Sequence, residues 1–124
     1  MENFKKYIIE DLSPEPLFIV DISWNHEGLK VTLESESGLD KIGILFYETV
    51  YLYQDTAESY KPRWRIDSSD EYYPFYYSKN SEMLDRLKED VDYVRDDEII
   101  HFVIIGLDDV IDVLTIEMPK VFKL

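Results

Sequence analysis

The chain has 124 residues, of which 45% are hydrophobic, and its 27 acidic and 13 basic residues give a net charge of −14. This length suits one domain, residues 1–124, and the apolar content excludes an intrinsically disordered polyanion. The chain has no cysteine, which excludes disulfides and thiolate metal sites, and its negative charge repels phosphate backbones and so disfavours nucleic acid as a partner.

The N-terminal segment 1–16 is too polar for a secretory signal, because Glu10 and Asp11 interrupt it early. Residues 3–12 are expected to form a short helix or an extended arm. The longest apolar stretches, 42–47 and 102–107, have about six residues, whereas a membrane-spanning helix needs about twenty. We therefore expect a cytoplasmic protein that does not enter a membrane.

Two runs of alternating apolar residues, 17–24 and 29–35, predict a pair of strands. The polar turn 25–28 between them predicts a β-hairpin. A second turn is expected at 35–40.

The next run, 42–53, is long and strand-like, with a bulge or break expected near Glu48 and Thr49. Its even positions are mostly aliphatic and its odd positions rich in tyrosine, so both faces are expected to be partly covered. The short run 63–66 is a further candidate strand.

The segment 82–94 predicts a helix, since its apolar residues fall on one face at helical spacing and residues 78–81 supply candidate N-caps. Asp85, Glu89 and Asp92 are expected to face solvent, and Glu82 can pair with Arg86 one turn later.

The almost continuous apolar run 98–105 predicts a strand in the centre of a sheet. Apolar residues at i, i+3, i+4 and i+7 in 107–114 favour a short helix, and the tail 119–124 reads as an extended edge segment. Together these elements predict a single α+β domain, with an antiparallel sheet of about four to six strands and one or two helices packed on one face.

Signatures of catalysis and of cofactor binding are missing from the sequence. His26 and His101 lie in no metal or triad motif, and the acidic stretches 95–98 and 107–112 lack the spacing of a calcium loop. The isolated glycines form no phosphate-binding loop. We therefore expect no enzyme activity, no metal and no cofactor, with His26 exposed and His101 satisfied by hydrogen bonds within the fold.

The stretch "DEYYPFYYSKN" at 70–80 places five aromatic residues within six positions. It opens the most acidic part of the chain, because residues 67–98 carry 11 acids and 4 bases, a net of −7. Some of these rings are expected to fill the core and others to form a protein-binding patch, as tyrosine is enriched among interface hot spots. The candidate partner-binding residues are Asp70, Glu71, Tyr72, Tyr76, Asp85, Glu89 and Asp92.

The stretches "LKVTLESESGLDKIGILFY" and "HFVIIGLDDVIDVLTIEMPKV" suggest small bacterial proteins in their order of elements. In this respect the chain resembles the immunity proteins that bacteria make against their own polymorphic or contact-dependent toxins. The resemblance implies stoichiometric inhibition, in which the acidic, tyrosine-bearing surface covers the active site of a basic toxin domain, often a nuclease.

Two other functions remain open at this stage. One is a structural or regulatory interaction module, of phage origin, that self-associates or binds a partner through a sheet edge. The other is a small hydrolase that uses its carboxylates with a divalent cation.

Overall fold

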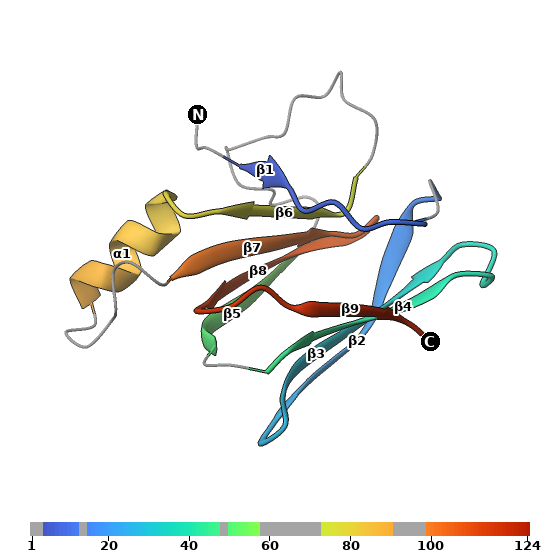
Figure 1. Cartoon of the computed structure of the whole chain (residues 1–124), viewed down its shortest axis with the longest axis horizontal. Helices are drawn as coiled ribbons and strands as arrows, with labels where there is room; N and C mark the ends of the chain where they lie inside the picture. The colour runs from blue at the N-terminus through green and yellow to red at the C-terminus, as the bar shows by residue number, and fades with distance from the viewer. Residues whose placement is uncertain (1–3, 13–14, 48–49, 58–72, 91–98) are drawn as a thin grey trace.

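The computed structural model describes residues 4–12, 15–47, 50–57, 73–90 and 99–124, and all strand pairs among them are antiparallel. They form a five-stranded sheet, β1-β6-β7-β8-β5, and a four-stranded sheet, β2-β3-β4-β9 (Figure 1). The elements are β1 (Lys5–Lys6), β2 (Leu17–Asn25), β3 (Gly28–Ser35), β4 (Lys41–Phe46), β5 (Val50–Ala57), β6 (Phe75–Ser78), α1 (Glu82–Asp90), β7 (Ile100–Ile105), β8 (Asp109–Thr115) and β9 (Lys120–Lys123). The fold is therefore mainly β with one helix, which matches the predicted α+β class only coarsely, because one sheet of four to six strands was expected.

The two sheets pack face to face around one apolar core. Strands β2, β3 and β4 contribute aliphatic residues and Phe46 from one side, and β6, β7 and β8 contribute aliphatic residues, Phe75 and Phe102 from the other. The rings of Phe46 and Phe102 meet edge to face across the interface, with their centroids 5.6 Å apart. In β3, the alternate residues Leu29, Val31 and Leu33 enter this core, whereas the bulge between Ile19 and Asp21 changes the row of β2 that faces it.

The predicted hairpin is confirmed by β2 and β3, which pair from Leu17 opposite Ser35 to Asn25 opposite Gly28. The Asn25 side chain accepts a hydrogen bond from the Glu27 backbone N–H at 2.8 Å and so shapes the turn. Gly28 has a φ of +123°, and a Cβ atom there would collide with the Phe46 carbonyl oxygen. Only glycine meets both requirements at this position.

The run 42–53 is divided between two strands in different sheets, since β4 ends at Phe46 and β5 begins at Val50. The predicted break is thus confirmed, although residues 48–49 themselves lie outside the described residues. The chain crosses from one sheet to the other here.

The predicted helix at 107–114 is wrong, because this segment forms β8 in the interior of the five-stranded sheet. Five consecutive residues from Val110 to Leu114 are buried, so both faces of the strand are covered. A strand covered on both faces shows no apolar alternation, and its apolar run resembled a helical pattern. β-branched residues at 110, 111 and 113 favour the strand.

The aromatic run enters the structure as β6, beside β7. Phe75 points into the core between the sheets, whereas Tyr76 packs on the other face of the sheet against Val103 and Val110. Phe75 and Tyr76 are only 0% and 4% exposed. The described part of the run is therefore largely core, and the candidate strand at 63–66 lies outside the described residues.

Other predictions are confirmed at the two ends of the chain. The N-terminal arm is extended and pairs with β6 as β1. The C-terminal segment forms β9, at the edge of the four-stranded sheet. β7 lies in the centre of its sheet, as its apolar run predicted.

Candidate functional site

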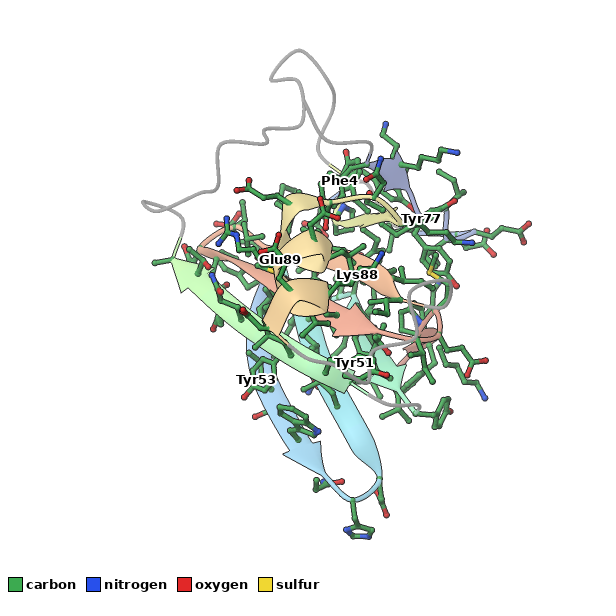
Figure 2. All side chains as sticks on the ribbon, turned by 90° about the vertical axis from the view of Figure 1, so that its left-hand side faces the viewer. Phe4, Tyr51, Tyr53, Tyr77, Lys88 and Glu89 are labelled. Carbon is green, nitrogen blue, oxygen red and sulfur yellow. The ribbon has the colours of Figure 1, made fainter. Side chains whose placement is uncertain are left out.

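Helix α1 follows β6 and lies in front of the five-stranded sheet in the view of Figure 2. Its apolar side is buried: Leu84 is 1% exposed and packs with Ile99 and Leu114, while Met83 and Leu87 extend the same cluster. This contact anchors residues 83–87 of the helix to the sheet and leaves its other side to solvent.

A buried hydrogen-bond network fixes the N-terminus of α1 to the sheet. His101 on β7 places Nδ1 2.7 Å from Ser81 Oγ and Nε2 2.6 Å from Asp112 Oδ1 on β8. Ser81 caps the helix, since its Oγ accepts a hydrogen bond from the Leu84 backbone N–H at 3.2 Å. The Phe4 ring covers the imidazole edge to face, at 5.1 Å between centroids. The network thus ties three elements, β7, β8 and α1, at one point.

Ser81, His101 and Asp112 are the residue types of a hydrolase triad, but their arrangement differs from one. In a triad the carboxylate holds Nδ1 and the serine meets Nε2, whereas here the two nitrogens have the opposite partners. All three residues are at most 1% exposed, so no substrate reaches Ser81. We therefore interpret the network as a structural clamp.

His101 was expected to be satisfied by hydrogen bonds, and this is confirmed. Its partners were missed, because they lie 20 and 11 positions away in sequence and meet only through strand pairing. One signal was available: Asp112 is the single charged residue in the apolar stretch 110–114 and needs a buried partner there. Its second oxygen, Oδ2, has no hydrogen-bond partner among the described residues.

The exposed side of α1 is mainly acidic, with Arg86 as its one exposed basic residue (Figure 2, where Glu89 is labelled). Glu82 forms an ion pair with Arg86 at 3.0 Å, as predicted from their spacing. Asp85, Glu89 and Asp90 are also exposed. We call the exposed residues Glu82, Asp85, Glu89 and Asp90 the acidic face of α1.

Only part of the predicted partner-binding set lies on this face. Asp85 and Glu89 do, and they point to solvent. Tyr76 is 4% exposed because it fills the outer layer of the five-stranded sheet, so it is removed from the candidate surface. Asp70, Glu71, Tyr72 and Asp92 lie outside the described residues.

A second acidic feature, which sequence reasoning missed, joins β5 to β8. Asp55 lies opposite Ile111, two positions from Asp109, so the two carboxyl groups are diagonal neighbours on one face of the sheet. The pKa of Asp109 is raised from 3.8 to about 7, first by burial, then by the hydrogen bond and charge of Asp55 and by the charge of Asp108. This pair could not be recognised from the sequence, because its members are 54 positions apart and only the β5–β8 register brings them together.

The Asp109 carboxyl should make the stability of the fold fall as the pH rises between about 4 and 7. In this window the folded protein holds a proton that the unfolded chain has released, so rising pH favours unfolding. Asp109→Asn should remove the effect, stabilising the protein at pH 8 by about 1 kcal/mol, a value reduced for solvent screening, and changing little at pH 4. Thermal unfolding of both proteins at pH 4, 6 and 8 measures this, and equal pH profiles would contradict it.

Within the described ranges, no group of three or more histidine, aspartate or glutamate side chains is placed to hold a metal ion. No helix in the described part of the chain has the length and apolarity needed to cross a membrane. Comparison with protein-family models, with curated proteins and with solved structures finds no match to this chain.

Proposed function

We propose that this protein is an acidic protein-binding module of the immunity type, which inhibits a basic toxin domain by covering its active site. The observation that supports the proposal is the acidic face of α1, presented on a helix that is fixed to the sheet. The net charge of −14 adds a long-range negative electrostatic potential around the protein, which attracts a basic partner.

The anchoring of the helix matters for binding. A charged surface on a mobile segment loses conformational freedom when a partner binds, and that loss weakens the complex. The acidic face has its apolar side buried and its N-terminus tied to the sheet by the network through Ser81 and His101, so its carboxylates are already in place. Such a surface accelerates association with a basic protein more than it increases the net affinity.

The partner class follows from the sign of the charge. A nuclease binds an anionic substrate in a basic site, and the carboxylates held on this anchored helix would compete for that site. Inhibition would then require one copy of this protein for each toxin, and it would weaken as salt screens the charges.

Reversing two charges of the acidic face tests this function. We expect Asp85→Lys/Glu89→Lys to slow association with the basic partner at least tenfold at low salt and to flatten the salt dependence of the rate. Both side chains are exposed, so the melting temperature should change little.

Glu27→Lys/Glu36→Lys is a matched control, because both acids are exposed in hairpin turns and the net charge changes by the same amount. The control variant should bind within about threefold of the unmodified protein. Equal slowing by the two double variants would show that net charge alone acts and would overturn the assignment to α1.

A further inference from the structure

The four edges of the two sheets formed by the described residues are unequally protected. β1, at one edge of the five-stranded sheet, has two residues, both lysine, and β9, at one edge of the four-stranded sheet, has Lys120 and Lys123 and follows Pro119. Short edges, lysine and proline are features that prevent strands from other chains from pairing. The opposite edges, β2 and β5, have nine and eight residues and contain no lysine, but Pro16 directly precedes β2, so β5 is the least protected edge.

β2 and β5 lie close together on the same side of the molecule, where Tyr53 is labelled in Figure 2. The rings of Trp24 on β2 and Tyr53 on β5 meet at 5.0 Å between centroids. Trp24 is 51% exposed and Leu52 on β5 is 40% exposed. Half-exposed aromatic residues beside an unpaired strand edge are features of a protein-binding surface.

Beyond a bulge near Tyr51, residues 52–57 of β5 pair regularly with β8. No described strand pairs with the other edge of β5. Gln54, Asp55 and Ala57 are exposed along this stretch. Six residues of regular strand are sufficient to receive a short extended segment through backbone hydrogen bonds.

The same stretch carries two carboxyl groups, Asp55 and Asp109, which are diagonal neighbours on one face of the β5–β8 pair. Their mutual repulsion disfavours ionisation of both groups, and a cation placed between them relieves it. A lysine or arginine side chain from an added strand would supply that cation, and the exposed indole of Trp24 would supply a second contact for arginine.

We propose that the edge of β5 with which no described strand pairs binds an extended basic segment of the partner protein, which adds a strand beside residues 52–57 and places a lysine or arginine at Asp55 and Asp109. The proposal rests on the proposed function, in that it assumes the same basic partner. The β5 edge would be a second contact region, distinct from the acidic face of α1. It would recognise the partner through backbone hydrogen bonds as well as through charge.

A second copy of this chain fits the edge poorly. Pairing of two β5 edges would bring the Asp55 carboxylates of both copies to one interface, between molecules that each carry a net charge of −14. A strand rich in lysine or arginine meets no such repulsion. Charge complementarity therefore selects the basic segment over self-association.

A synthetic ten-residue peptide of alternating valine and arginine is the probe, with its valine–glutamate counterpart as the charge control. Titration into the isotope-labelled protein at low salt, followed by amide chemical shifts, should show shifts confined to β5 and to the adjoining part of β2. The arginine peptide carrying N-methyl groups at alternate residues should bind at least tenfold more weakly, because it cannot complete the backbone pairing. Equal binding of the N-methylated peptide, binding of the glutamate peptide, or shifts located only on α1 would overturn the proposal.

Asp55→Asn in the protein should weaken arginine-peptide binding about fivefold, whereas Glu117→Gln, at an exposed acid beyond the other end of β8, should leave it unchanged. Loss of affinity in both variants, or in neither, would contradict the assigned contact. The outcome is separable from that of the proposed function: an α1-dependent basic partner with no peptide binding overturns the β5 site alone. Peptide binding without any such partner overturns the proposed function alone.

Discussion

Replacement of His101 with alanine is expected to lower the free energy of unfolding by about 3–5 kcal/mol, one of the two largest single-residue effects that the structure predicts. His101 is the only described partner of Asp112 Oδ1, and Asp112 Oδ2 has none, so the variant leaves a buried carboxyl group without a hydrogen bond. Urea unfolding measures the change. Hydrogen exchange should also show faster opening of α1, because the link between Ser81 and the sheet is lost.

The double variant His101→Leu/Asp112→Leu is the control for this prediction. Replacing both members of a buried polar pair with apolar residues of similar size is often neutral for stability. We therefore expect the double variant to be more stable than His101→Ala by at least about 2 kcal/mol. If the double variant were as unstable as His101→Ala, the pair would contribute packing and no specific interaction.

Replacement of Phe102 with alanine is expected to cost about 3–5 kcal/mol. This ring is 0% exposed and contacts Phe46 on the opposite sheet as well as Tyr7 in the N-terminal arm. Its loss would leave a cavity between the two sheets, which close-packed neighbours fill only in part. Urea unfolding should show a lower midpoint with an unchanged slope.

Phe122→Ala provides the comparison, because Phe122 is half-buried on the outer side of the four-stranded sheet, over Gly43. Its removal should cost about 1–2 kcal/mol, the value for apolar area returned to water. A larger loss for Phe122 than for Phe102 would contradict the placement of the core between the sheets.

Two of the correctly predicted elements, the hairpin and the helix, are more buried on one side than on the other, and a third, β7, was recognised from its nearly continuous apolar run. In β3, Leu29, Val31 and Leu33 are buried in the core, whereas Lys30 and Glu34 on the other row are only partly buried, so the sequence alternates. Helix α1 shows a helical period for the same reason, and its cap at Ser81 was among the candidates. The spacing of apolar residues in the sequence therefore identifies the type of an element that is buried on one side.

The incorrect or missed predictions concern elements that are buried on both faces and contacts between residues that are distant in sequence. β8 is covered on both faces, so the helix predicted at 107–114 had no alternation to oppose it. The division of 42–53 between two sheets could not be inferred, because a break in a strand does not say which partner each half pairs with. The outcome was two sheets where one was expected.

The candidate site, like the fold, could be predicted only in part from the sequence. Asp85 and Glu89 were recognised from helical spacing and are exposed on α1. Tyr76 was misassigned because the alternation of β6 does not show that the outer face of its sheet is also covered. The carboxyl pair of Asp55 and Asp109 and the clamp at His101 depend on strand register, which the sequence does not contain.

The most direct test of the proposed function is capture of partners from a native cell extract at low salt, with elution by a salt gradient. We expect a single basic protein that is toxic when expressed alone. The unmodified protein and Glu27→Lys/Glu36→Lys should retain it, and Asp85→Lys/Glu89→Lys should not. Recovery of the unmodified protein alone, or of a partner held equally by both double variants, would contradict this expectation.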